Sequence, residues 1–201
     1  MTLEDFTTYI KYDPNDRIMD LTSNHLEFWS IRNMRTRLYA NYGYDHFGDF
    51  EHDISVRRTY STDNGLAYCY MLANVVKDVS DLQNDNDEGI GFYVYDTSGG
   101  LVYWRLNEIY EGNSWIDSYT SSSSAYHYLT IEKVSTTLTC KIYSDVERTN
   151  LLTTLSLTLH ADHKFKYVYA INTFHLSSSV TLRLYIDDLD LKESKDYGVI
   201  I

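Results

Sequence analysis

Two alternating stretches, Ile90-Gly-Phe-Tyr-Val-Tyr95 and Val102-Tyr-Trp-Arg-Leu-Asn-Glu108, predict a β-hairpin. In each stretch apolar side chains occupy every second position, which is the period of a strand with one buried face. Both apolar sets face one core only if Val94 lies opposite Trp104, because a slip of one residue would turn one strand over. This register leaves 98–100 as a three-residue loop with a glycine for its left-handed position. It groups the following side chains on the other face: Tyr93, Tyr95, Tyr103 and Arg105.

The same period continues outward from this hairpin over nearly the whole chain. About a dozen short runs bounded by Asp, Asn, Gly and Ser predict an all-β fold, a two-sheet antiparallel jelly-roll sandwich. The expected strands lie near 17–21, 25–31, 37–42, 49–59, 66–76, 90–95, 102–110, 126–133, 138–143, 151–159, 166–174 and 180–191. One short helix is expected within 75–82, and Leu182, Leu184 and Ile186 are expected to face the core.

A chain of 201 residues fits a single sandwich domain. We find neither an internal repeat nor a linker, so we expect a lead segment over 1–12, the jelly-roll domain over 13–192 and a tail over 193–201.

Composition excludes several classes of protein. The formal net charge of −12 disfavours nucleic acid as a partner, because a phosphate backbone would be repelled. Apolar runs are all shorter than the ~18 residues of a membrane span, and residues 1–12 lack the pattern of a secretory signal. Cys69 and Cys140 each lie in an apolar strand, so we expect two buried free thiols, with pairing across neighbouring strands as the alternative.

Five segments together resemble the concanavalin A-like lectin/glucanase superfamily, in its laminin-G-like branch. They are Asp13-Pro-Asn-Asp-Arg-Ile18, Phe47-Gly-Asp-Phe-Glu-His-Asp53, Tyr126-His-Tyr-Leu-Thr-Ile131, Ile142-Tyr-Ser-Asp145 and Tyr185-Ile-Asp-Asp-Leu-Asp-Leu191. The resemblance implies a jelly roll of the kind found in uncharacterised viral and environmental proteins. Members of the superfamily often bind carbohydrate, and some are subunits of particles or filaments.

Glu51-His-Asp53 resembles part of the catalytic strand of retaining glucanases in this superfamily, which carries two glutamates on one face. Here Glu51, Asp53 and Ser55 share a face, and the second glutamate is absent. Retaining hydrolysis needs two carboxyls about 5–5.5 Å apart, and Asp53 would have to supply one of them. A glycoside hydrolase is therefore a second alternative, disfavoured because the motif is incomplete. A solvated acidic strand face with His52 packed inward is the expected arrangement.

The densest group of carboxylates is a candidate calcium site, because Ca²⁺ prefers oxygen ligands. It comprises Asp78, Asp81, Asp85 and Asp87, and the alternative is a solvated turn. A second candidate comprises Asp187, Asp188 and Asp190, with strand-edge charges as the alternative. The two histidines of His160-Ala-Asp-His163 are expected on a loop surface rather than at a zinc site.

The predicted function is that of a non-catalytic, lectin-like module, because a tyrosine-rich face suits sugar rings. Its expected ligand-binding residues are Tyr68, Tyr70, Tyr93, Tyr95, Tyr103 and Arg105. The alternative is an assembly subunit of a virion, fibre or extracellular filament. The expected partners are therefore carbohydrate or copies of the chain itself in a homo-oligomer, at a virion or extracellular surface. Three aliphatic residues at the end of the tail, Val199, Ile200 and Ile201, are the expected assembly contact.

Overall fold

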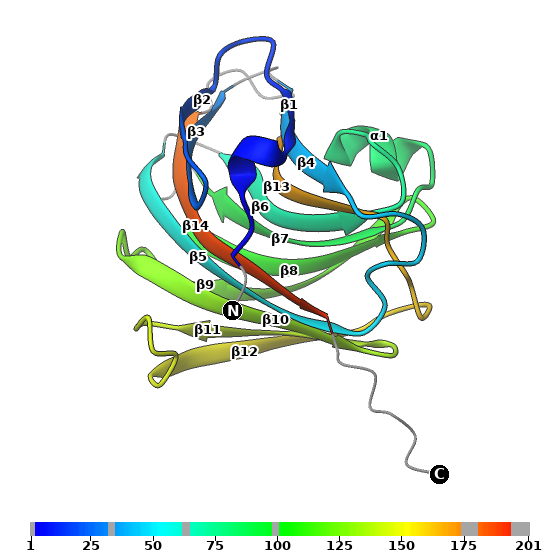
Figure 1. Ribbon diagram of the computed structural model, residues 1–201. Helices are drawn as coiled ribbons and strands as arrows, with labels where there is room; N and C mark the ends of the chain where they lie inside the picture. Colours follow the sequence, from blue (N-terminus) through cyan, green and yellow to red (C-terminus); the bar gives the residue numbers. More distant parts are fainter. Residues whose placement is uncertain (1–2, 32–34, 62–64, 98–100, 174–180, 194–201) are drawn as a thin grey trace.

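The computed structural model describes residues 3–31, 35–61, 65–97, 101–173 and 181–193. Fourteen strands form two antiparallel sheets of seven strands, and the sheets pack face to face (Figure 1). The prediction of an all-β jelly-roll sandwich is therefore confirmed.

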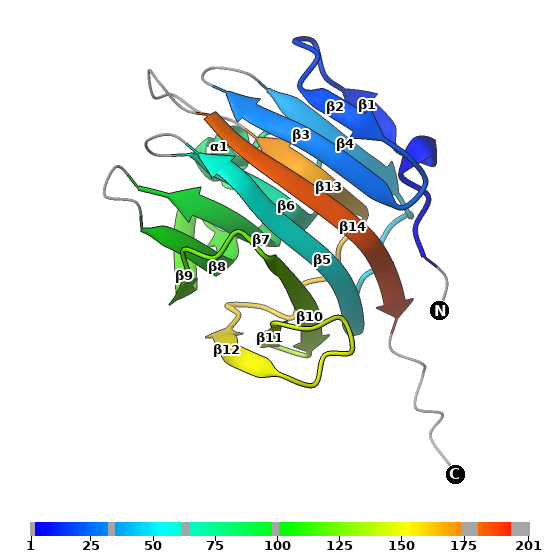
Figure 2. The ribbon, with the colours of Figure 1, turned by 90° about the vertical axis from the view of Figure 1, so that its left-hand side faces the viewer.

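The sheet that faces the viewer in Figure 2 is called the front sheet and has the strand order β12-β11-β10-β5-β14-β3-β2. Its strands are β2 Ile18–Leu21, β3 His25–Ile31, β5 Phe50–Ser61, β10 Tyr126–Val134, β11 Thr137–Tyr143, β12 Leu151–Thr158 and β14 Thr181–Glu193. The strand β14 lies between β5 and β3 and is therefore not an edge strand. The alternative that Asp187, Asp188 and Asp190 are strand-edge charges is wrong for this reason.

The second sheet, called the back sheet, has the order β1-β4-β13-β6-β7-β8-β9. Its strands are β1 Ile10–Tyr12, β4 Thr36–Asn41, β6 Leu66–Ala73, β7 Gly89–Asp96, β8 Val102–Tyr110, β9 Asn113–Thr120 and β13 Tyr167–Thr173. Two of these, β1 and β9, were not expected. The strand β9 alternates clearly, but its alternate residues are mostly polar and half-exposed, so it lacks an apolar face.

The core lies between the sheets and is filled from alternate positions of their strands. Leu182, Leu184 and Ile186 of β14 are fully buried, as expected. One of the inward-facing residues of β5 is His52, whose Nδ1 lies 2.6 Å from the Tyr70 hydroxyl oxygen. Burial lowers the pKa of His52 to about 3, with smaller contributions from His46 and Lys192, so the imidazole stays neutral in the core.

The hairpin register is confirmed: Val94 pairs with Trp104, and Tyr95 pairs with Tyr103. The Trp104 ring is fully buried and stacks on His127 at 4.0 Å between ring centroids. The predicted loop 98–100 lies outside the described residues.

Short helices cover parts of the sandwich. The 3-10 helix η1, Phe6–Thr8, is followed by β1, so the sandwich begins within the segment that we expected to precede it. The helix α1, Val79–Asn84, lies against the outer face of the back sheet (Figure 1). Its Leu82 packs into a second apolar cluster with Tyr68, Met71, Tyr93, Ile109 and Tyr169.

Cys69 and Cys140 are both buried and unpaired, as expected. No helix in the described part of the chain is long and apolar enough to cross a membrane.

Candidate functional site

The outward-facing side chains of the front sheet form rows that cross the strands. The pairings of β3, β14, β5 and β10 give five rows: Trp29, Arg183 and Tyr60; Glu27, Tyr185, Arg57 and Tyr126; His25, Asp187, Ser55 and Tyr128; Asp190, Asp53 and Thr130; Lys192, Glu51 and Glu132. Aromatic residues therefore gather at one end of this face, together with Arg57 and Arg183, and most of the carboxylates lie at the other end, together with Lys192.

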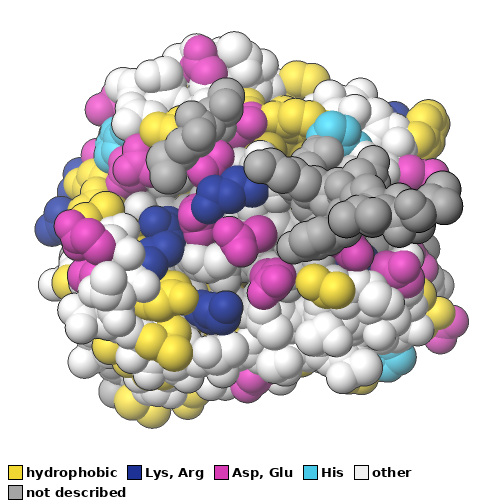
Figure 3. All heavy atoms as spheres, turned by 60° about the horizontal axis from the view of Figure 1, so that its bottom comes forward, with side chains coloured by type: hydrophobic (Ala, Val, Ile, Leu, Met, Phe, Trp, Pro, Cys, Tyr) yellow, Lys and Arg dark blue, Asp and Glu magenta, His cyan; other side chains and the backbone are white. Residues whose placement is uncertain are grey.

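Three adjoining hollows follow these rows, with volumes of about 260, 420 and 230 Å³. The first and third share Ser55, Val146 and Asp188, and the second and third share Tyr126 and Tyr128. They form one continuous groove, called the front groove. On the face of the molecule seen in Figure 3, acidic and basic side chains are intermingled near the middle, so the net charge of −12 does not give a uniformly acidic surface.

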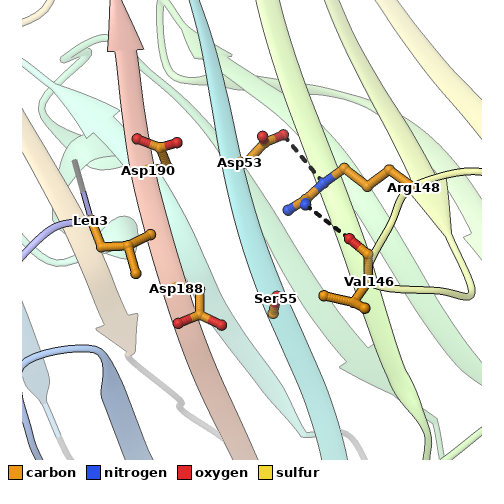
Figure 4. A pocket seen from close by; sticks show the side chains of 7 residues that line it. All are labelled: Leu3, Asp53, Ser55, Val146, Arg148, Asp188 and Asp190. Carbon is orange, nitrogen blue, oxygen red and sulfur yellow. Dashed lines mark hydrogen bonds and ion pairs between the residues drawn. The ribbon is translucent and has the colours of Figure 1, made fainter. Parts of the chain in front are cut away.

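One end of the front groove is built around Asp53, which is only 5% exposed although its strand face points outward. Arg148, from the loop between β11 and β12, reaches across the pocket to within 3.3 Å of its carboxylate (Figure 4). Lys192 forms a second ion pair with Asp53, and the Thr130 hydroxyl donates a hydrogen bond of 2.6 Å to it. Our expectation of a solvated acidic face holds for the exposed Glu51 but is wrong for Asp53, because this ring of partners encloses it.

A β-bulge in β14 brings two further carboxylates to the same pocket. Before the bulge the even-numbered residues face the core, whereas after it Leu189 is fully buried and Asp190 points into the groove. Asp188 absorbs the extra residue with a φ of 53°, in the left-handed region. Asp190 is 2% exposed, and its Oδ2 has no hydrogen-bond partner among the described residues.

The middle of the front groove holds a histidine, an aspartate, a tyrosine and an arginine from four different strands. His25 Nδ1 is paired with Asp187 Oδ1, and the Arg57 guanidinium lies 5.6 Å from the centre of the Tyr126 ring. Burial and, to a smaller extent, Asp187 raise the pKa of Tyr126 to about 12, against an opposing effect of Arg57. A tyrosine with this pKa is protonated at neutral pH and can donate its proton. Asp187 Oδ2 is buried and has no hydrogen-bond partner among the described residues.

Aromatic rings extend the groove beyond this centre. Arg57 also lies 5.7 Å from the ring of Tyr185, and Arg183 lies 5.4 Å from the ring of Trp29. Arg183 is paired with Glu27 at 2.6 Å, whereas Arg57 forms no ion pair among the described residues. Its guanidinium is therefore available to an anionic ligand at the middle of the groove.

The expected ligand-binding face on the hairpin is only partly present. Tyr68 and Tyr93 are 4% and 3% exposed beneath the cluster around α1, and Tyr70 faces the core. These three tyrosines do not reach the surface, so that part of the prediction needs correction. A bulge in β6 between Tyr68 and Tyr70 turns Tyr70 to the core, whereas the cluster around Leu82 of α1 covers Tyr68 and Tyr93. The remaining residues, Tyr95, Tyr103 and Arg105, are half-buried on the outer face of the back sheet.

The structure does not bring the four carboxylates of the expected calcium site together. Asp78 and Asp81 pair with Arg35, at 2.7 and 2.9 Å, whereas Asp85 and Asp87 pair with Lys77. No group of three or more His, Cys, Asp or Glu side chains in the described ranges is arranged to hold a metal ion. Each of these carboxylates is paired with the side chain of Arg35 or Lys77.

The two histidines expected on a loop surface occupy different environments. His160 is partly exposed, whereas His163 is buried with its two ring nitrogens 3.0 Å from Glu88 and Glu108. The expectation of a loop surface is therefore wrong for His163. The expected assembly residues Val199, Ile200 and Ile201 lie outside the described residues.

Four residues of the groove were not expected from the sequence, namely His25, Arg57, Tyr126 and Arg148, whereas Asp187 was expected only as part of a candidate calcium site. Each lies on a different strand or loop, and none forms a local motif. The alternation of Tyr126 and Tyr128 and the doubled Asp187-Asp188 were the only signals in the sequence.

No protein-family model matches this sequence, and neither does any curated protein. Similarity appears in solved structures. A functionally unknown protein from Saccharomyces cerevisiae has a TM-score of 0.59 at 9% identity, covering 95% of this chain and 99% of that one. The alginate lyase from Klebsiella pneumoniae has a TM-score of 0.59 at 9% identity, and the match covers 85% of this chain and 81% of that one. The endo-β-1,4-glucuronan lyase from the fungus Trichoderma reesei has a TM-score of 0.51 at 10% identity, and the match covers 96% of this chain and 90% of that one. Identities this low establish a shared fold only.

These comparisons agree with the resemblance to concanavalin A-like jelly rolls, and they contradict two predictions. The chain was expected to be a non-catalytic lectin-like or assembly module and not an enzyme. The similar structures are mostly carbohydrate-active enzymes, so both predictions are wrong. The missing second glutamate speaks against only one catalytic arrangement, the two glutamates of a glucanase strand. A viral origin gains no support from the comparisons.

Proposed function

We propose that this protein is a carbohydrate-active enzyme that cleaves an acidic polysaccharide by β-elimination in the front groove. The observation that carries the proposal is the set formed by Arg57, Tyr126, Asp187 and His25 in the middle of the groove. The shared fold with alginate and glucuronan lyases supports the choice of polysaccharides that contain uronate.

Elimination next to a uronate needs three groups. A cation must neutralise the carboxylate, because the proton on the adjacent carbon is acidic only when the charge of the developing enolate is stabilised. A base must take that proton, and an acid must protonate the leaving glycosidic oxygen. The products are a reducing end and a sugar with a new carbon–carbon double bond.

The groove supplies a candidate for each role. Arg57 has no ion pair among the described residues and suits the uronate carboxylate. In the tautomer whose Nδ1–H donates to Asp187, His25 keeps a free lone pair on Nε2 to accept the proton. Tyr126, whose pKa is raised to about 12, holds the proton for the leaving oxygen.

The rest of the groove suits a sugar chain. The rings of Tyr126 and Tyr128 lie 6.1 Å apart between centroids and line the second and third hollows. Asp187 and Asp190 each carry a buried oxygen without a hydrogen-bond partner among the described residues. Sugar hydroxyls would satisfy these acceptors, which are costly to leave unpaired.

The test is incubation of the purified protein with alginate and with glucuronan. We expect new ultraviolet absorbance from the unsaturated uronate, together with new reducing ends. Tyr126→Phe and His25→Ala should each lower kcat by roughly 10²- to 10⁴-fold, the usual contribution of a general acid or base.

Tyr44→Phe is the matched control, because Tyr44 is 86% exposed and is not among the residues that line the groove. It should leave cleavage unchanged. If no uronate polymer yields an unsaturated product, or if Tyr126→Phe remains as active as the natural protein, the proposal is wrong.

Hydrolysis is the second candidate, because Asp53 and Asp190 are directly opposite neighbours on β5 and β14. Opposite residues have Cβ atoms about 4.5–5.5 Å apart, close to the ~5–5.5 Å between the carboxyls of retaining glycosidases. Hydrolysis would produce reducing ends without ultraviolet absorbance. It would be lost in Asp53→Asn and Asp190→Asn and kept in Tyr126→Phe.

A further inference from the structure

The outer face of the back sheet carries a second arginine surrounded by tyrosine rings. The Arg105 guanidinium carbon lies 4.6 Å from the centre of the Tyr103 ring and 4.9 Å from that of Tyr95. It lies 5.8 Å from the Tyr93 ring, and one of its NH groups donates a hydrogen bond of 3.4 Å to the Tyr93 hydroxyl. The rings of Tyr95 and Tyr103 are stacked, with 25° between their planes.

Among the described residues, no acidic side chain forms an ion pair with Arg105. Arg58, Arg148 and Arg183 all form ion pairs, whereas Arg105 forms none with the residues that the structure describes. Its Nε is buried and has no hydrogen-bond partner among those residues. In a protein with a net charge of −12, an unbalanced cation on an aromatic surface favours an anionic ligand.

The neighbouring strand adds hydroxyl groups to this surface. Ser118 of β9 lies opposite Arg105, and Thr120 lies opposite Tyr103. Both are exposed. The surface thus combines aromatic rings, a guanidinium fork and hydroxyls, the groups that stack on a sugar ring, bind a carboxylate and bind sugar hydroxyls.

We infer that Arg105, Tyr103 and Tyr95 form a second binding surface, separate from the front groove, for a sugar that carries a carboxylate. The two surfaces lie on opposite outer faces of the sandwich. They therefore bind either two distant segments of one polymer chain or two separate polymer molecules. The choice of a uronate rests on the proposed function, whereas the choice of an anionic sugar rests on Arg105 itself.

The test is equilibrium binding of an alginate tetrasaccharide, with neutral cellotetraose as the comparison sugar, measured by titration calorimetry on a Tyr126→Phe background so that no cleavage occurs. We expect two molecules of the uronate ligand per chain. Arg105→Gln should remove one, weakening that site roughly 10-fold or more, as expected for loss of a charged hydrogen bond. Arg57→Gln should remove the other.

Controls separate this surface from overall charge and from folding. Lys11→Gln removes one positive charge from the edge of the same sheet and should leave both sites intact. Ser118→Ala changes only an exposed hydroxyl and should weaken the second site alone while the melting temperature stays the same.

The inference is overturned if Arg105→Gln leaves affinity and stoichiometry unchanged, or if cellotetraose binds that site as tightly as the uronate. Failure of the proposed function has a different signature: Arg57→Gln then changes neither binding nor cleavage, while the effect of Arg105→Gln remains.

Discussion

His163 shows how one side chain ties the two sheets together. It lies in the segment that leads from β12 of the front sheet to β13 of the back sheet, and it contacts Glu108 of β8. Burial lowers the pKa of His163, but hydrogen bonds and charges from Glu108 and Glu88 outweigh this effect and raise it overall. Burial likewise raises the pKa of Glu108, but hydrogen bonds from His163 and His160 lower it overall.

A raised histidine pKa gives stability that is complete below the unfolded value of 6.5 and is lost as the pH rises through the folded value. We therefore expect His163→Gln to lower the free energy of unfolding by about 3 kcal/mol near pH 6 and by clearly less near pH 9. Urea denaturation at the two pH values measures this difference.

His127→Gln is the control, because burial lowers the pKa of His127 to about 4 and this side chain is neutral at both pH values. Its cost should not depend on pH in this range. An equal cost of His163→Gln at the two pH values would contradict the ion-pair interpretation.

At the scale of elements, the bulge in β14 sets which side chains reach the front groove. Without the extra residue, Asp190 and Lys192 would face the core and Leu189 would face the solvent. Asp188 carries the strain of this change in its positive φ, and two hydrogen bonds with Asn24, each 3.0 Å, hold it there.

We expect Asp188→Val to lower the free energy of unfolding by about 1–2 kcal/mol, because a β-branched residue is poorly tolerated in the left-handed region. Asp188→Gly should cost less, since glycine adopts this region readily. Asp20→Val is the matched control on the exposed strand β2, where the aspartate has no positive φ, and it should be nearly neutral. Equal stability of the two Asp188 variants in thermal denaturation would contradict this conformation.

At the scale of the whole molecule, the net charge of −12 opposes the approach of an acidic polymer, although the groove itself contains cations. Adding salt shortens the Debye length from about 30 Å at 0.01 M to about 10 Å at 0.1 M. We expect kcat/KM on a polyuronate to rise over this range, because long-range repulsion is screened before the short contacts at Arg57 are weakened. A rate that falls steadily with salt would mean that local attraction dominates the encounter.

Local alternation was enough to predict the sandwich, the faces of the hairpin strands and the Val94–Trp104 register, because a period of two residues and a short loop act between neighbours in the chain. It also predicted that His52 points into the core, on the side of its strand opposite to Glu51 and Asp53. These features depend on the residues of one or two adjacent strands.

The order of the strands, in contrast, was decided by the tertiary structure. Only the placement of β14 between β5 and β3 brings His25, Arg57 and Asp187 together, although they come from distant parts of the sequence. The packing of α1 likewise buries Tyr68 and Tyr93, which alternation alone assigned to an open face. Periodicity shows that a side chain leaves the strand on a given face, but long-range packing determines whether solvent, a helix or a neighbouring strand meets it there.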